Sequence, residues 1–198
     1  MRDTLFVLAL KQETRGLLEP LGADILYTGI GKVNAAHVLT RELTLRRHQG
    51  RLPARVVNLG TAGSRSFRTG ELVACHRFVQ RDMDVTPLGF ALGETPYEST
   101  PVILETGIVF PDLTSGLCGS GDSFVTGDLA MSCEVLDMEA YALAKVCLGE
   151  AIPFAAVKYI TDGADADAAE HWPERLRHAA EAFAGFVRDR FPNASPNV

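Results

Sequence analysis

The chain has 198 residues, of which 46% are hydrophobic and 22% charged, and its formal net charge at pH 7 is -6. This length and composition predict one globular domain with a core of its own and exclude a disordered chain. The acidic balance argues against a nucleic-acid partner, since domains that bind nucleic acids carry a basic excess. A membrane partner is not expected either, because no apolar run reaches the ~20 residues of a spanning helix.

The N-terminal segment is predicted to be a strand rather than an export signal. An apolar run covers residues 4–10, but Lys11, Gln12 and Glu13 follow at once, where a signal peptide would continue to a small-residue cleavage site. The cysteines have neither C-x-x-C nor zinc spacing, so we expect buried thiols in a reducing cytoplasm. They are Cys75, Cys118, Cys133 and Cys147.

Hydrophobic periodicity alternates between strands and helices along the chain. In chain order it predicts strand 4–10, helix 12–21, strand 23–28, helix 32–49, strand 54–59, strand 71–80, a turn-rich stretch 81–101, strand 102–109, strand 134–136, helix 139–148, strand 154–160 and helix 173–191. The last helix is the clearest, because Leu176, Ala180, Phe183 and Val187 recur at helical spacing. We therefore predict a single α/β domain over residues 1–192, with a central mixed, mostly parallel β-sheet flanked by helices. Residues 193–198 are predicted to form a flexible C-terminal tail.

Ligands of such sheets bind beyond the C-terminal ends of the strands, where several glycine-rich segments fall. The segment Gly29-Ile30-Gly31-Lys32 is not a phosphate-binding Walker loop, because Val33 follows the lysine instead of Ser or Thr. It is not a dinucleotide fingerprint either, because Asn34 takes the place of the third glycine. No nicotinamide cofactor is therefore expected, and a tight strand-to-helix turn explains the segment equally well.

Two further glycine-rich segments are candidates for ligand contact. In residues 58–64, glycines permit a close backbone approach and Thr61 offers a hydroxyl. In residues 119–125, Phe124 follows a Gly-Ser-Gly turn and suits stacking on a flat ring. A structural turn and a core phenylalanine explain these segments equally well.

Carboxylates at strand ends are the best candidates for chemistry. Asp137 and Glu139 lie where a strand meets a helix, so they suit either two sugar hydroxyls or a helix dipole. Asp162 ends a strand, and an apolar cleft would raise its pKa and make it a usable acid, although it also suits a capping role. Asp82 and Asp84 form a D-x-D pair without further ligands, so no metal is expected.

In combination, these motifs resemble the nucleoside phosphorylase superfamily, and within it the nucleosidases that hydrolyse 5′-methylthioadenosine and S-adenosylhomocysteine. The resemblance runs from about Leu8 to the C-terminal helix, and Met138-Glu139-Ala140 and Thr161-Asp162 are its most specific parts. It implies a nucleoside phosphorylase-like fold, a purine nucleoside substrate, no cofactor and a homodimer.

The resemblance also implies a role for individual residues. Asp162 would be the general acid at N7 of the purine, and Glu13 would position or activate the attacking water, although Gln12 is close enough to compete for this role. Glu139 would bind the ribose 2′- and 3′-hydroxyls beside Met138. Thr61 and Gly63 would take part in substrate and water binding, and Phe124 and Val125 would contact the base. Trp172 would lie at the 5′ end, and Lys158 would take the place of a water-contacting arginine. The neighbouring subunit would add a wall made of Val85, Leu88, Phe90 and Pro96.

The choice of nucleophile can be tested against charge. Phosphate needs arginines, and phosphorylases of the superfamily place one where this chain has Asn58 and another near Glu13. An amide and a carboxylate at these positions favour water, and therefore hydrolysis over phosphorolysis. Arg15 and Lys32 leave phosphorolysis open.

The exact substrate and the class of protein are less tightly constrained by the sequence. The stretch between Phe90 and Gly119 is too short for the helix that relatives hold there, so futalosine and plain adenosine remain possible substrates. A non-catalytic nucleoside-binding protein is disfavoured by the three carboxylates, and a dinucleotide-dependent oxidoreductase by Asn34.

Overall fold

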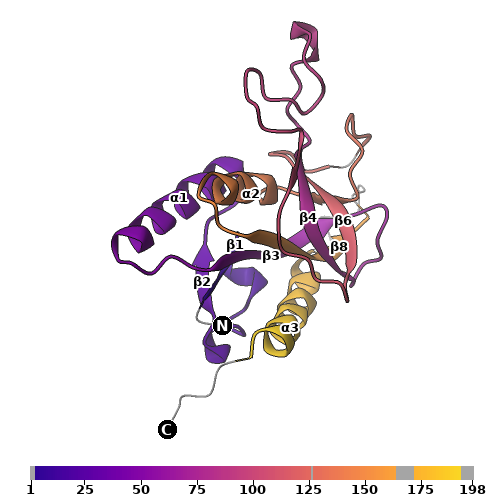
Figure 1. Ribbon diagram of the computed structural model, residues 1–198. Helices are drawn as coiled ribbons and strands as arrows, with labels where there is room; N and C mark the ends of the chain where they lie inside the picture. The colour runs from indigo at the N-terminus through magenta and orange to yellow at the C-terminus, as the bar shows by residue number, and fades with distance from the viewer. Residues whose placement is uncertain (1–2, 126, 164–171, 193–198) are drawn as a thin grey trace.

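A computed structural model describes residues 3–125, 127–163 and 172–192 of the chain, with the backbone alone for 172–174 (Figure 1). The predicted tail at 193–198 lies outside the described residues. The strands are β1 (Thr4–Leu8), β2 (Asp24–Tyr27), β3 (Arg55–Gly63), β4 (Leu72–Gln80), β5 (Ile103–Glu105), β6 (Thr114–Ser120), β7 (Val135–Asp137) and β8 (Phe154–Asp162). The helices are α1 (Lys32–His48), α2 (Ala140–Gly149) and α3 (Trp172–Arg190), and short 3-10 helices cover Lys11–Glu13, Glu19–Leu21 and Thr86–Leu88. None of the helices in these described ranges is long and apolar enough to cross a bilayer.

The strands form one mixed sheet in which five members close a ring. β3 pairs with β8, β8 with β4, β4 with β6, β6 with β7, and β7 again with β3. β1 and β2 extend the sheet from β3, and β5 extends it from β4. Five of these pairings are parallel and three antiparallel, in agreement with the predicted mostly parallel sheet. Because β3 and β8 run parallel, their C-terminal ends meet at one edge, where Gly63 is paired with Asp162.

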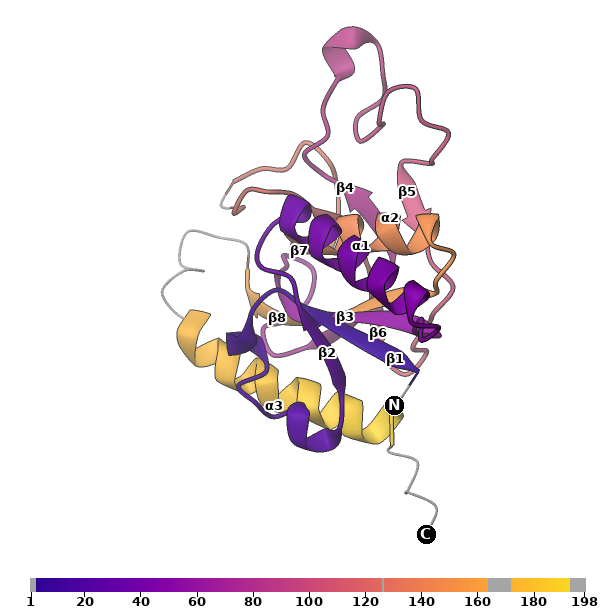
Figure 2. The same ribbon diagram turned by 90° about the vertical axis from the view of Figure 1, so that its left-hand side faces the viewer.

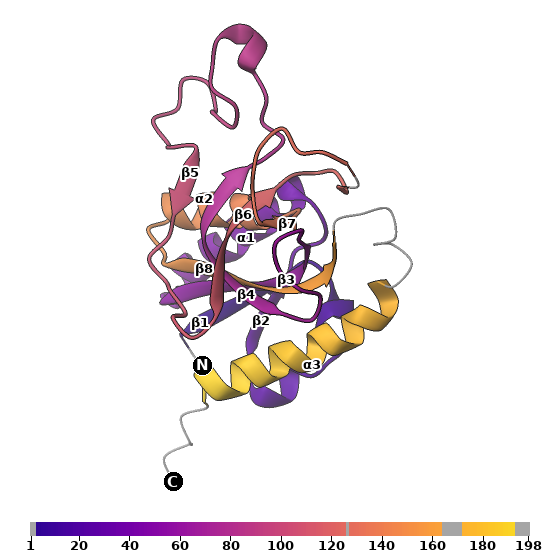
Figure 3. The ribbon, with the colours of Figure 1, turned by 90° about the vertical axis from the view of Figure 1, so that its right-hand side faces the viewer.

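The helices cover both faces of the sheet, so the central strands are buried on both sides. Figure 2 and Figure 3 show α1 and α2 on one face and α3 on the other. Successive side chains of a strand point to opposite faces, and β1 follows this rule: Leu5 and Val7 join the core under α1 and α2, whereas Phe6 and Leu8 join the core under α3. Continuous apolar runs of this kind are typical of doubly covered sheets.

Two predicted elements differ from the structure. Residues 12–21 form no continuous helix, because Arg15 and Gly16 have positive φ angles of 49° and 76° that interrupt it after the first 3-10 turn. The strand predicted at 102–109 is shorter, covering only Ile103–Glu105.

One strand was not predicted at all. β6 has the sequence Thr-Ser-Gly-Leu-Cys-Gly-Ser, which is poor in the β-branched and aromatic residues that signal a strand. It is stabilised instead by its two neighbours in the ring, β4 and β7. The turn-rich stretch 81–101, called the arm below, is as expected, and it protrudes from the body in Figure 1, Figure 2 and Figure 3.

Candidate active site

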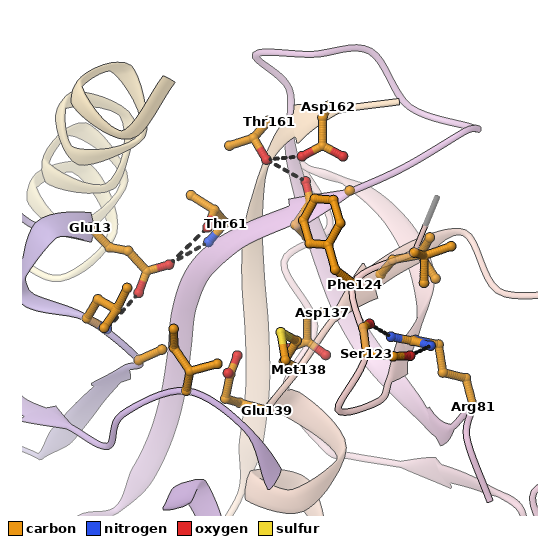
Figure 4. A pocket seen from close by; sticks show the side chains of 17 residues that line it. Glu13, Thr61, Arg81, Ser123, Phe124, Asp137, Met138, Glu139, Thr161 and Asp162 are labelled. Carbon is orange, nitrogen blue, oxygen red and sulfur yellow. Dashed lines mark hydrogen bonds between the residues drawn. The ribbon is translucent and has the colours of Figure 1, made fainter. Parts of the chain in front are cut away.

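A cavity of about 350 Å³ opens at the C-terminal ends of β1, β3, β7 and β8 (Figure 4). This volume lies within the ~300–1,000 Å³ typical of small-molecule sites. The lining residues come from seven separate parts of the sequence. They are Ala9, Leu10, Glu13, Ile30, Thr61, Ala62, Gly63, Arg81, Ser123, Phe124, Val125, Leu136, Asp137, Met138, Glu139, Thr161 and Asp162.

Glu13 is held on one side of the cavity by three donors. Its Oε2 accepts a hydrogen bond from the Leu10 amide at 3.0 Å, and its Oε1 accepts from the amide and the hydroxyl of Thr61 at 2.9 and 3.2 Å. The side chain is buried. These bonds fix the orientation of the carboxylate at the cavity wall.

Glu139 immediately precedes α2 and reaches across to the start of α1. Its Oε1 accepts a hydrogen bond from the Gly31 amide at 2.8 Å. Burial, and after it the nearby Asp137 carboxylate, raises the pKa of Glu139 from 4.5 to about 7. Both protonation states of this group are therefore populated near neutral pH.

A buried ion pair lies behind Glu139. The Lys158 ammonium is 2.7 Å from Asp137 Oδ2, and the two side chains are 1% and 0% exposed. Burial alone would raise the pKa of Asp137, but Lys158 together with hydrogen bonds from Ser120 and the Ala140 amide outweighs it and holds the pKa below its ordinary value. Burial alone would lower the pKa of Lys158, but Asp137 and its neighbours raise it above the ordinary value. The pair therefore remains ionised at neutral pH.

Gly60 makes room for this arrangement. A Cβ atom added at Gly60 would lie 3.2 Å from Lys158 Nζ and 3.4 Å from Glu13 Oε1. The Lys158 ammonium and the Glu13 carboxylate thus both lie close to Gly60, where any side chain would crowd them.

The opposite side of the cavity carries Asp162 and the segment around Phe124. Asp162 is buried at the end of β8, and its Oδ2 accepts a hydrogen bond from the Thr161 hydroxyl at 2.6 Å. Phe124 is 60% exposed and follows the turn after β6. Figure 4 shows Glu13 and Thr61 on one side of the cavity and Ser123 and Phe124 on the other.

The structure brings most of the predicted site residues together. Eight of them line the cavity: Glu13, Thr61, Gly63, Phe124, Val125, Met138, Glu139 and Asp162. Lys158 lies one layer behind it, in contact with Asp137. The four predicted wall residues, Val85, Leu88, Phe90 and Pro96, lie in the arm and do not line the cavity of their own chain. The Trp172 side chain lies outside the described residues.

Comparison with known proteins places this geometry in a family. The sequence profile of the Phosphorylase superfamily matches residues 23–190. The 5′-methylthioadenosine/S-adenosylhomocysteine nucleosidase of Geobacillus kaustophilus (strain HTA426) is 32% identical over 196 residues, which cover 88% of this chain and 81% of the relative. The chain belongs to this nucleosidase family of the phosphorylase superfamily. The predicted family, fold and nucleosidase class are thereby confirmed.

Solved structures of similar fold include family members with bound inhibitors. The nucleosidase of Neisseria meningitidis in complex with methylthio-immucillin-A has a TM-score of 0.78 at 24% identity, covering 94% of this chain and 97% of that structure. The futalosine hydrolase of Helicobacter pylori strain 26695 has a TM-score of 0.79 at 23% identity, covering 95% and 97%. At these identities the likeness concerns the fold, and it does not separate the two substrates.

Arg81 is a site residue that the sequence motifs did not indicate. Among the described residues that line the cavity, it alone carries a positive charge. Its guanidinium donates to the Ser123 hydroxyl and to the Gly121 carbonyl, each at 3.2 Å, and also to the Ser123 carbonyl. These partners lie about forty residues along the chain, so no local spacing could have identified them.

The other positions considered for phosphate binding do not line the cavity. Asn58 is buried and donates to the Val7 carbonyl at 2.9 Å, and Arg15 and Lys32 do not line the cavity. The D-x-D pair also has ordinary partners: Asp82 accepts from Lys32, and Asp84 from the amide and hydroxyl of Thr86.

Proposed function

We propose that this protein hydrolyses the N-glycosidic bond of 5′-methylthioadenosine or S-adenosylhomocysteine to free adenine and a free sugar. The observation that carries the proposal is the convergence of Glu13, Glu139 and Asp162 on one cavity that also holds an aromatic side chain. The names of the relatives support the choice of nucleosides.

On the base side, Asp162 donates a proton to N7 of the purine as the bond between C1′ and the base breaks. The bonding electrons leave with the base, which departs neutral because of this proton. Such general acid catalysis contributes about 10²–10⁴-fold in rate. Phe124 stacks on the purine, and the backbone of Val125 contacts its edge.

On the sugar side, Glu139 accepts hydrogen bonds from the ribose 2′- and 3′-hydroxyls, and Met138 packs beside the ring. Glu13 orients the attacking water with the help of Thr61 and receives its proton as the new bond to C1′ forms. The oxocarbenium-like sugar thus lies between carboxylates, which stabilise the positive charge that develops on it.

Water is favoured over phosphate because the cavity offers no uncommitted cation among the lining residues that the structure describes. Arg81 already bonds Ser123 and Gly121, and Glu13 would repel an anion where the nucleophile must enter. A cavity that uses phosphate needs arginines aimed at it.

A nucleoside panel with and without inorganic phosphate tests the proposal. Methylthioadenosine, S-adenosylhomocysteine, adenosine and futalosine are incubated with the enzyme, and free base, free sugar and sugar 1-phosphate are measured by chromatography. We expect phosphate-independent release of adenine and free sugar from the first two. Release that requires phosphate and yields a sugar 1-phosphate would contradict hydrolysis.

We also propose a cytoplasmic homodimer in which the arm of one subunit closes the cavity of the other. The arm presents exposed apolar side chains at its tip: Leu88 is 74% exposed and Tyr97 97%. These exposed apolar side chains on a protruding segment would be covered if the arm packed against a second subunit. The four cysteines are free thiols, which agrees with a reducing compartment.

Size-exclusion chromatography with light scattering should give a dimer, and Leu88→Asp should shift it toward the monomer and raise KM. A strict monomer at micromolar concentration would contradict this assembly.

A further inference from the structure

Two sequence motifs that received no role meet beside the cavity. Lys32, from the Gly-Ile-Gly-Lys segment, places its ammonium 2.5 Å from Asp82 Oδ1, in the D-x-D pair, and 3.9 Å from Asp122 Oδ2. The Lys32 side chain is 15% exposed and that of Asp82 29%, so this contact is shielded more than most surface ion pairs. The three residues come from the start of α1, the start of the arm and the turn after β6.

Backbone hydrogen bonds close the three residues into a ring. Asp122 Oδ1 accepts from the Lys32 amide at 2.8 Å, and Asp82 Oδ2 accepts from the Asp122 amide at 2.9 Å. Partial burial would raise the pKa of Asp82, but the bonds from Lys32 and Asp122 outweigh it and hold the pKa below its ordinary value. Asp82 therefore stays ionised at neutral pH.

Gly31 is required for the ring to close. Its φ angle is +93°, and an added Cβ would lie 3.2 Å from Asp122 Oδ1. A side chain at this position would be strained and would also press against the carboxylate of the ring.

Each residue of the ring is next in sequence to a residue that lines the cavity or bonds one that does, Arg81 being the neighbour of Asp82. Gly31, next to Lys32, donates its amide to Glu139, the proposed ribose ligand. Ser123 and Phe124, next to Asp122, line the proposed base side. Phe124 is 60% exposed, so core packing does not hold this loop, and polar bonds from the ring and from Arg81 do.

We propose that Lys32, Asp82 and Asp122 are positioning residues that hold the loop 121–125 at a fixed distance from Glu139, and so set the affinity of the enzyme for the purine. The proposal rests on the function proposed above, because it takes this loop to be the base-binding one. Lys32 does not line the cavity, so it acts through Asp82 and Asp122 rather than by contact with the nucleoside. This role also explains why Lys32 is present without a phosphate ligand, since the carboxylates of Asp82 and Asp122 already neutralise its charge.

Lys32→Met is the sharpest test, because it keeps the length of the side chain and removes the charge. Adenine and methylthioribose are titrated separately into the protein by calorimetry, which needs no turnover. We expect the Kd of adenine to rise about tenfold, with the Kd of methylthioribose within twofold of the wild type. In steady-state assays KM should rise more than kcat falls.

Three variants complete the test. Asp122→Asn keeps an oxygen acceptor for the Lys32 amide and should weaken adenine binding less than Asp122→Ala does. The double variant Lys32→Met, Asp82→Asn should bind adenine no more weakly than Lys32→Met alone, because both substitutions break the same contact. Arg47→Met is the matched control: it breaks an exposed pair with Glu150 at the other end of α1 and should leave adenine affinity unchanged.

Three outcomes would overturn the proposed role of the ring. If Lys32→Met weakened the binding of adenine and of methylthioribose equally, the effect would be a general structural one. Unchanged adenine affinity would show that the ring does not position the loop. A wild type that binds no adenine would show that the loop is not a base-binding one. If the wild type binds adenine but releases no base from nucleosides, the hydrolase proposal fails while the variants still decide the role of the ring.

Discussion

The two sides of the cavity are built differently. On the proposed sugar side, Glu13 is held by three hydrogen bonds to its own turn and to β3, and Glu139 lies in front of a fully buried Lys158–Asp137 pair. On the proposed base side, Phe124 is largely exposed on a loop that is held by the Arg81 bonds and the ring around Lys32. Asp162 brings the end of β8 to that side.

This difference separates two tasks. Groups held by regular elements and buried bonds are placed more precisely than groups on exposed loops, and precise placement matters most where bonds form and break. A loop that only stacks on a flat ring tolerates small displacements. We therefore expect changes at the buried carboxylates and the ion pair to reduce kcat or stability, and changes on the loop to raise KM.

Removal of the strand-end acid should give the largest effect. Asp162→Asn cannot act as the proposed general acid at N7, so we expect kcat to fall about 10²–10⁴-fold with little change in KM. Adenine release under saturating substrate measures this. Asp112→Asn, which removes an aspartate paired with Arg190 on the surface, is the control and should keep full activity. A fall of less than tenfold in Asp162→Asn would remove this residue from the chemistry.

Removal of the buried ammonium should give the largest loss of stability. Lys158→Met leaves Asp137 buried without its counter-charge, which typically costs about 3–5 kcal/mol of the free energy of unfolding. Urea titration followed by circular dichroism measures this. Lys145→Met is the matched control, because it breaks an exposed pair with Glu98 and should cost under about 1 kcal/mol.

The double variant Lys158→Met, Asp137→Asn tests the cause of that loss. The asparagine side chain introduced by the second substitution is neutral and still offers an oxygen to its hydrogen-bond donors, so part of the stability should return. If the double variant were as unstable as Lys158→Met alone, an uncompensated charge would not explain the effect.

The sequence predicts those parts of the fold whose cause is local. α3 follows from apolar residues at helical spacing, and Leu176, Ala180, Phe183 and Val187 are all buried in the structure. The helix expected at 12–21 is interrupted by the positive φ angles of Arg15 and Gly16, and Glu13 in its first turn bonds Thr61, 48 residues away, a contact that periodicity cannot indicate. β6 was missed because its pairing with β4 and β7, rather than its composition, makes it a strand.

The same division holds for the site. Glu139 and Asp162 could be identified because each belongs to a short motif at a strand end. Arg81, the ring around Lys32 and the space left by Gly60 could not, since each depends on side chains that approach from distant segments. The residues proposed to react were thus more predictable than those that hold them in place.

The pKa of Glu139 predicts a pH-dependent contribution to stability on the sugar side. The folded protein raises this pKa from 4.5 to about 7, so folding favours the protonated form. The resulting stabilisation is complete below about pH 4.5 and is lost as the pH rises through about 7. Glu139→Gln cannot titrate, so it does not share this loss. The free energy of unfolding of the variant minus that of the wild type should therefore rise by about 1–3 kcal/mol from pH 5 to pH 7.5. Denaturant titrations at several pH values measure this, and a constant difference would mean that Glu139 does not titrate in this range.

Removal of the aromatic ring from the base-side loop should give the smallest effect. Phe124→Leu loses ring stacking, worth about 0.5–1.5 kcal/mol, so we expect KM to rise about two- to tenfold while kcat stays within twofold. Phe124→Tyr keeps the ring and should match the wild type. Because this side chain is 60% exposed, neither variant should lower the melting temperature measurably. A fall in kcat at constant KM would mean that the loop aligns the base for bond cleavage, and both sides of the cavity would then share the task proposed here for the buried carboxylates.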